Sequence, residues 1–261
     1  MPFSSVRPSA AALAALLLAV GCTTVGGPAG DRTAPGRELS ADELRAAAVA
    51  EADLGTGYAV LSAASGRGGP GIGAGREAAD VPACQPLLDV VAPAAPVDAP
   101  PGPGRPYAET DLSVVRAAGS RGGVHVALLG HRSGQAAVLQ GELEGLLGPC
   151  ASFTSVPAAE KPGEKSGEKP GRKVPVRTKH RLNREDTPTP EGADAVIGFT
   201  LTNESGTAVP AQRAELVRVG PALAVFTTVG VAPEPAPAPD VRVVRQQVAK
   251  LRAAQAASVR P

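Results

Sequence analysis

The sequence predicts an α+β domain, with helices packed on an antiparallel sheet, one disulfide and long Pro/Gly-rich loops. Three β-rich segments occupy residues 174–182, 194–203 and 211–231. Apolar residues recur at helical spacing ahead of these segments, over residues 133–150, and after them, over residues 241–254. A sheet formed by the β-rich segments would bury its apolar face under these helices.

Residues 1–21 are predicted to be a lipoprotein signal peptide. The apolar stretch from Ala11 to Val20 is shorter than the ~20 residues that a membrane-spanning helix needs. A basic residue followed by a short apolar run is typical of a secretory signal. Residues 19–22, Ala-Val-Gly-Cys, resemble the lipobox of bacterial lipoproteins, which implies a diacylglycerol on Cys22. The alternative is an ordinary secretory signal with a free cysteine.

The rest of the chain is predicted to be a flexible tether and a single folded domain. Residues 22–39 are rich in Gly, Pro and Thr and lack periodicity. The domain is expected over residues 40–257, beginning with a helix that ends near Ala52. Ser40 and Glu43 have the spacing of a capping box at the start of this helix. Its apolar face would comprise Leu44, Ala47 and Ala48.

The next elements are short and separated by loops. Residues 65–82 are predicted to be a flexible surface loop, and Cys84 begins a short helix or turn. After a second loop, residues 109–118 and 122–131 are expected to pair as a β-hairpin. The helix predicted over residues 133–150 would bury one apolar face, made of Val138, Leu139, Leu143, Leu146 and Leu147.

The last third contains a charged insertion, the three β-rich segments and a final helix. Residues 157–173 contain three Glu-Lys pairs with Gly-containing spacers, so we expect them to be disordered. The third β-rich segment is expected to fold back at Gly220 and Pro221. The final helix would place one apolar face on the sheet, made of Val241, Val244, Val248 and Leu251.

Once Cys22 is assigned to lipid, Cys84 and Cys150 are the remaining thiols. Cysteine pairs in exported proteins normally form disulfides, because their environment is oxidising. A disulfide between Cys84 and Cys150 would close a long loop of the chain. On the chain-entropy model, such a bond stabilises the fold by roughly 4 kcal/mol. Two separate buried thiols are the alternative. The sequence has neither Cys-x-x-Cys nor His-x-x-x-His, so a metal site is not predicted.

Composition argues against several classes of function. The chain has 26 Lys and Arg residues against 25 Asp and Glu residues, and removing Arg7 with the signal peptide leaves it formally neutral. Nucleic-acid binding relies on a basic surface, so it is not expected. Aromatic residues make up only 2% of the chain, which argues against aromatic cages. No cofactor is predicted.

Five segments together resemble a group of actinobacterial cell-surface lipoproteins, which are similar to the extracellular sensor domain of a mycobacterial receptor serine/threonine kinase. The segments are "EADLGTGYAV", "ACQPLLDVV", "LEGLLGPCASF", "AELVRVGPALAVFTTVG" and the final helix. The resemblance implies an α+β sensor-like domain with a cleft, displayed outside the membrane. That sensor domain uses two disulfides, whereas Cys84 and Cys150 allow only one here.

No catalytic arrangement is evident, so a non-enzymatic function is predicted. The nucleophile elbow Gly-x-Ser-x-Gly is absent. His125, His131 and His180 are interpreted as ordinary surface histidines, and Glu142 and Glu144 as part of a solvated helix face. We expect a lipoprotein anchored at the extracytoplasmic face of the cell membrane, where it binds or senses an unknown ligand. The alternatives are a structural or partner-binding envelope protein, and a hydrolase.

Overall fold

The computed structural model describes seven stretches of the chain: residues 36–62, 77–91, 106–116, 123–157, 177–204, 211–230 and 234–257. The chain divides into two units, residues 1–34 and 35–261, and every described residue belongs to the second. The predicted signal peptide and Cys22 lie outside the described residues, as does the predicted insertion beyond residue 157.

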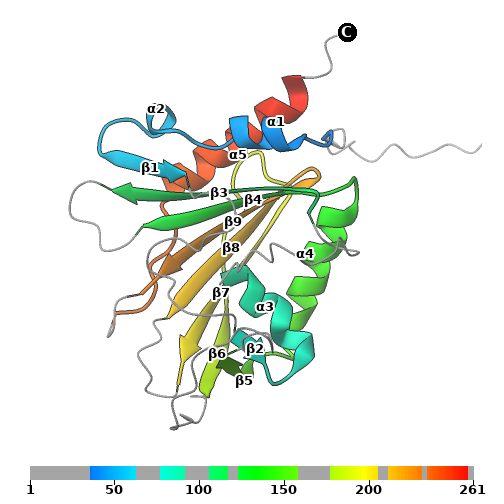
Figure 1. Cartoon of the computed structure of the whole chain (residues 1–261), viewed down its shortest axis with the longest axis vertical. Helices are drawn as coiled ribbons and strands as arrows, with labels where there is room; N and C mark the ends of the chain where they lie inside the picture. Colours follow the sequence, from blue (N-terminus) through cyan, green and yellow to red (C-terminus); the bar gives the residue numbers. More distant parts are fainter. Residues whose placement is uncertain are drawn as a thin grey trace, which may run out of the picture. The chain divides into compact units, whose positions relative to one another are not determined.

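The described residues form a nine-stranded antiparallel sheet with the strand order β1-β3-β4-β9-β8-β7-β6-β5-β2 (Figure 1). This sheet confirms the predicted α+β class. Consecutive strands β3–β4 and β6–β7–β8–β9 pair as neighbours, as the hairpin and the β-rich segments predicted. The strands are β1 Tyr58–Ser62, β2 Glu77–Ala79, β3 Ala108–Arg116, β4 Val124–Gly130, β5 Ser152–Pro157, β6 Thr178–Glu185, β7 Ala195–Asn203, β8 Gln212–Val219 and β9 Ala222–Val229.

Helices cover both faces of the sheet (Figure 1). One face packs against α1 (Ala41–Ala46), α2 (Glu51–Leu54) and α5 (Val241–Ala256). The other packs against α3 (Gln85–Val91), which a short 3₁₀ turn precedes, and α4 (Gln135–Leu146). The described part of the domain therefore has two hydrophobic cores, one on each side of the sheet.

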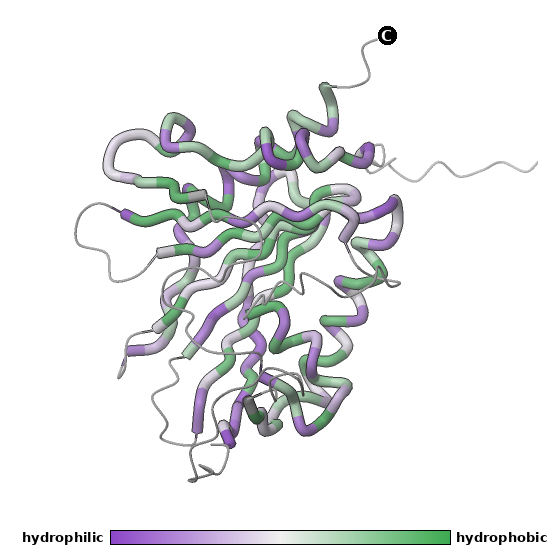
Figure 2. The backbone as a smooth tube through the Cα atoms, in the orientation of Figure 1, coloured by the Kyte–Doolittle hydropathy of each residue, from purple (hydrophilic) through white to green (hydrophobic). Residues whose placement is uncertain are grey.

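The central strands contribute to both cores. Along β9, Ala224 and Phe226 belong to one core and Val225 to the other, and β8 divides Val217 and Leu216 in the same way. Strands buried on both faces lose the alternation of polar and apolar residues and become nearly continuous hydrophobic runs. Figure 2 shows this hydrophobic character along the central strands.

The first predicted helix is interrupted. The capping box is confirmed, since the Ser40 side chain accepts the Glu43 N–H and the Glu43 carboxylate accepts the Ser40 N–H. However, α1 ends at Ala46 and α2 begins at Glu51. Between them, the side chain of Gln247 on α5 donates to the Ala47 carbonyl at 2.8 Å and accepts the Val49 N–H at 3.0 Å. This amide satisfies backbone groups that a continuous helix would otherwise pair.

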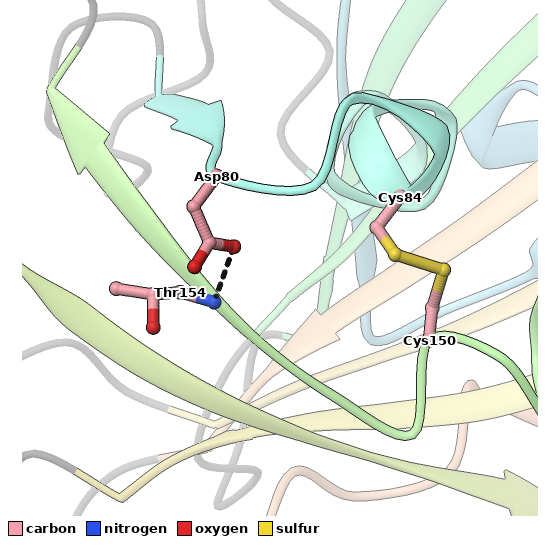
Figure 3. Close-up of a disulfide and its surroundings, with 4 residues drawn as sticks. All are labelled: Asp80, Cys84, Cys150 and Thr154. Carbon is pink, nitrogen blue, oxygen red and sulfur yellow. Dashed lines mark hydrogen bonds between the residues drawn. A yellow bond between two sulfur atoms is a disulfide. The ribbon is translucent and has the colours of Figure 1, made fainter.

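The predicted loop over residues 65–82 contains a strand that the sequence did not indicate. The three residues of β2 pair with β5. Asp80 continues the contact: its backbone N–H donates to the Thr154 carbonyl, and its carboxylate accepts the Thr154 N–H at 2.9 Å (Figure 3). A strand this short has no sequence periodicity to detect. Partners on β5 therefore determine its conformation.

Two predicted core positions are exposed. Val138 on α4 lies outside the buried stripe, which runs through Ala136, Gln140 and Leu143. Val138 follows Ala136 by two residues, and 100° per residue turns its side chain toward solvent. Val241 is the first residue of α5 and is also exposed, whereas Val244, Val248 and Leu251 are buried as predicted.

Candidate functional site

Three polar side chains come together on three adjacent strands at one face of the sheet. Asp111 lies on β3, His125 on β4 and Thr227 on β9. Thr227 is directly opposite His125, and Asp111 is directly opposite Ala127, two residues further along β4. Opposed residues of antiparallel strands share a face, as do residues two apart on one strand. We call these three residues the polar cluster.

Each residue of the polar cluster has a buried polar atom without a hydrogen-bond partner. The side chains of Asp111 and His125 are 14% and 11% exposed, and Thr227 is 1% exposed. Asp111 Oδ1, His125 Nδ1 and Thr227 Oγ1 have no hydrogen-bond partner. Asp111 Oδ1 and His125 Nε2 are 3.7 Å apart, which is too far for a hydrogen bond. An unsatisfied buried polar group costs about 1–3 kcal/mol, so three on one face need an explanation.

Burial also determines the charges at this face. Desolvation raises the pKa of the Asp111 carboxyl. It also raises the pKa of Glu109, two residues before it on the same face, and the negative charge of Asp111 adds to that shift. Desolvation lowers the pKa of His125, which favours a neutral imidazole near pH 7. The face therefore combines two carboxylates with a neutral ring and a hydroxyl group.

Exposed apolar side chains border the polar cluster. Leu61 on the edge strand β1 is 53% exposed, and Val115 on β3 is 37% exposed. Leu61 is opposite Ser113, which is itself opposite His125, so the apolar border and the polar cluster lie on one face. Ligand sites typically combine apolar surface with a few polar groups of this kind.

A second cluster joins Glu77, Ser155 and His180 at the β2 end of the sheet. The Ser155 Oγ lies 2.5 Å from Glu77 Oε2 and 2.6 Å from His180 Nε2. Ser155 and His180 are both buried. The prediction that His180 is a surface residue is wrong. His180 is instead enclosed because it lies directly opposite Phe153, with the two rings 5.2 Å apart.

The geometry of this second cluster differs from that of a nucleophilic serine. A hydroxyl has only one proton, so Ser155 donates it to Glu77 and its oxygen accepts a hydrogen bond from His180 Nε2–H. A catalytic histidine would have to accept the serine proton at this nitrogen and pair with an acid at the other. Glu77 instead approaches Nε2, at 3.5 Å. The interaction with His180 is the main cause that lowers the pKa of Glu77.

A third cluster is a closed ion-pair network on the opposite face. The guanidinium of Arg213 lies 3.4 Å from a Glu185 oxygen and 3.2 Å from a Glu215 oxygen, and Thr200 donates to Glu185 at 2.6 Å. Desolvation raises the pKa of Glu215 and Arg213 offsets part of that rise. Both carboxylates have a cation, which indicates a structural role.

The sequence-predicted site residues have different outcomes. Cys84 and Cys150 form the predicted disulfide, with an S–S distance of 2.08 Å (Figure 3). The interpretation of His125 and His131 as surface residues is wrong. His131 follows β4 and is fully buried. Its backbone N–H donates to the Pro221 carbonyl, and burial lowers the pKa of its imidazole ring.

Sequence reasoning missed the polar cluster, although one signal for it was present. His125 is a polar residue inside the apolar run "VHVALL", which became a central strand. A polar side chain in such a strand needs either a partner or a function. His125 lies opposite Thr227 on β9 and opposite Ser113 on β3, two residues from Asp111. This strand register, which brings the polar cluster together, exists only in the folded sheet.

Among the described residues, no three or more His, Cys, Asp and Glu side chains are grouped as metal ligands. None of the helices in the described part of the chain combines the length and hydrophobicity that crossing a membrane requires.

No protein-family model and no curated protein matches the chain. Among solved structures, the chain is similar to the extracellular domain of PknH from Mycobacterium tuberculosis, with a TM-score of 0.46 and 12% sequence identity. The similarity covers 84% of this chain and 97% of the PknH chain. It agrees with the resemblance that the sequence motifs indicated.

Proposed function

We propose that the protein binds a small ligand over the sheet face that carries Asp111, His125 and Thr227, and that it does so as a non-enzymatic lipoprotein outside the cell membrane. One observation carries the ligand site. Three polar side chains on three adjacent strands each have a buried atom without a hydrogen-bond partner. Folded proteins pair almost all such groups, and a ligand that reaches this face would supply the missing partners.

A binding role is favoured over catalysis by the chemistry of the two histidine clusters. In the polar cluster, His125 Nδ1 has no hydrogen bond to a hydroxyl or thiol group in the part of the chain that the structure describes. In the second cluster, the Ser155 hydroxyl is fully buried and donates its proton to Glu77. That hydroxyl is out of reach of a substrate in this conformation, because Ser155 is 0% exposed.

The extracytoplasmic location is supported by the disulfide between Cys84 and Cys150, because such bonds persist in oxidising compartments. Lipid anchoring at Cys22 rests on the lipobox-like residues 19–22. Mass spectrometry of the membrane fraction should find a diacylglycerol adduct on an N-terminal Cys22. Full release of the protein that Cys22→Ser leaves unchanged would contradict the anchor.

A thermal-shift screen tests the ligand site. The full chain carrying Cys22→Ser would be screened against cell-wall precursors, lipids and metabolites, since binding to the native state raises the melting temperature. Compounds that stabilise this protein should lose their effect in Thr227→Val and His125→Phe variants. Asp42→Asn is the matched control, because Asp42 is an exposed acid on α1. Equal stabilisation of all variants would show that the compounds bind elsewhere.

The alternative is a partner-binding envelope protein, and the exposed Leu61 on edge strand β1 favours it. The two functions differ in the same assay. A protein partner would lose affinity in Leu61→Asp and retain it in Thr227→Val, because Thr227 is buried beneath the surface that a flat partner contacts. A small ligand would depend on Thr227.

A further inference from the structure

Most partly buried acids of the described residues have a lysine or arginine partner, whereas the partly buried Asp111 and the exposed Glu109 do not. In the part of the chain that the structure describes, Asp194 pairs with Arg218 and Arg252, Asp53 pairs with Lys250, and Glu204 pairs with Lys179 and Arg181. Glu215 has Arg213, as described above. The fold thus supplies a lysine or an arginine to each of these carboxylates.

Glu109 and Asp111 have no such cation within 4.0 Å in the described residues, and Asp111 Oδ1 accepts no hydrogen bond. His125 is the nearest basic group, but its burial favours the neutral ring. Two carboxylates two residues apart on the same face of β3, with no countercharge in the described residues, repel each other. A positively charged ligand group would remove both costs at once.

A second, independent feature points into the same place. The Thr227 hydroxyl is 1% exposed, has no hydrogen-bond partner and stands opposite His125 on this face. A hydroxyl can donate or accept, and the neutral ring of His125 can do the same. These groups would complement a ligand that carries polar atoms next to its cationic group.

The side chains present favour an organic cation over a metal ion. The described residues contain no group of three or more acidic, histidine or cysteine ligands, so Glu109, Asp111 and His125 are not arranged around one metal position. The apolar border, Leu61 and Val115, lies on the same face. An exposed apolar border suits the hydrocarbon part of an amphipathic molecule.

We infer that the ligand of this face is an organic cation, with an ammonium or guanidinium group held between Glu109 and Asp111 and an apolar part extending toward Leu61. This inference rests on the proposed function and names the chemical class of its ligand. A charged N–H donor forms its strongest hydrogen bonds with carboxylates, and here the partly desolvated site strengthens them further.

A matched set of probes tests the class. Hexylammonium, hexan-1-ol and hexanoate share one hydrocarbon chain and differ in charge. They would be titrated into the full chain carrying Cys22→Ser at pH 7, with the imidazole NMR signals of His125 as the local readout. Hexylammonium should bind about tenfold or more tightly than hexan-1-ol, as a charge-assisted contact predicts. It should also bind more tightly than methylammonium, which lacks the apolar part.

Variants separate the carboxylates from the rest of the fold. Asp111→Asn and Glu109→Gln should each remove most of the preference for hexylammonium over hexan-1-ol, whereas Asp42→Asn should keep it. Glu109 is exposed, so Glu109→Gln provides a test even if a change at Asp111 alters folding.

Two outcomes overturn the inference in different ways. If hexan-1-ol or hexanoate shifts the His125 signals as strongly as hexylammonium, the ligand class is wrong and binding at this face stands. If neither these probes nor any compound from the thermal-shift screen affects His125, the proposed function fails as well.

Discussion

The Cα atoms of Cys84 and Cys150 lie 5.7 Å apart, although 66 residues separate them in the chain. The bond joins the start of α3 to the segment just after α4, so it ties together the two helices that cover one face of the sheet (Figure 3). Both cysteines are buried in the core that these helices form. The disulfide thus fixes the helical layer on that face.

Cys84→Ser should therefore destabilise the domain by roughly 2–5 kcal/mol, the usual cost of losing such a bridge in an exported domain. The double variant Cys84→Ser/Cys150→Ser should cost about the same as either single variant, because each change removes the same bond. Urea unfolding measures these free energies. Thiol labelling of the unreduced, denatured protein should find neither Cys84 nor Cys150 free, and stoichiometric labelling of both would contradict the pairing.

Asp111→Asn should stabilise the domain at neutral pH. The folded-state pKa of Asp111 is raised above its ordinary value of 3.8, so the fold favours the protonated form. That favourable contribution is present below pH 3.8 and is lost as the pH rises through the folded-state pKa. An uncharged amide avoids the loss, and we expect a gain of about 0.5–2 kcal/mol at pH 7, the range of single stabilising changes.

The gain should disappear at acidic pH, where Asp111 is already neutral. Melting temperatures of the wild type and the variant, measured from pH 7 down to pH 3, would follow this convergence. Asp42→Asn should have almost no effect, because Asp42 forms only an exposed pair with Arg45. A loss of stability in Asp111→Asn at pH 7 would show that the carboxylate has a favourable partner.

Ser155 should resist reagents that modify nucleophilic serines. Its hydroxyl is buried, and its proton is donated to Glu77. A fluorophosphonate probe, followed by peptide mass spectrometry of the native protein, should leave Ser155 unlabelled. Rapid labelling of Ser155 would favour the hydrolase alternative over a binding function.

Ser155→Ala should instead change stability, by about 1–3 kcal/mol, because it removes two hydrogen bonds and leaves Glu77 and His180 without their bridge. The folded-state pKa of Glu77 lies below its ordinary value of 4.5, so its stabilising contribution is present above pH 4.5 and is lost as the pH falls through the lower value. Unfolding measured in urea at pH 7 and at pH 3 should show a smaller effect of Ser155→Ala at pH 3.

Arg213→Met should destabilise the domain by roughly 3 kcal/mol, because it leaves the buried Glu215 carboxylate without its cation. The double variant Arg213→Met/Glu215→Leu should recover most of that loss, since it removes the charge together with its partner. Urea unfolding of the two variants compares these effects. Equal destabilisation in both would show that Arg213 contributes mainly through the packing of its aliphatic part.

Local patterns predicted the elements that have strong local signals. The capping box at Ser40 and Glu43, the turn at Gly220 and the periodicity of Val244, Val248 and Leu251 all depend on residues close in sequence. Gly220 has a φ of 56°, a conformation that glycine adopts without steric cost. The turn between β8 and β9 could therefore be predicted from the sequence. The count of cysteines likewise predicted the disulfide.

Tertiary structure decided the features that depend on distant partners. β2 is a strand because its residues pair with β5 and Asp80 bonds to Thr154. α1 ends at Ala46 because the side chain of Gln247, about 200 residues later, donates to the Ala47 carbonyl. The burial of His125 and its position beside Asp111 and Thr227 arise from the pairing of β3, β4 and β9. Sequence by itself determined the helices and strands that have a strong periodicity, such as β7, β9 and α5, because periodicity is a local property. Only the folded sheet determined which polar groups are left without partners, since hydrogen-bond satisfaction depends on neighbours that register brings together.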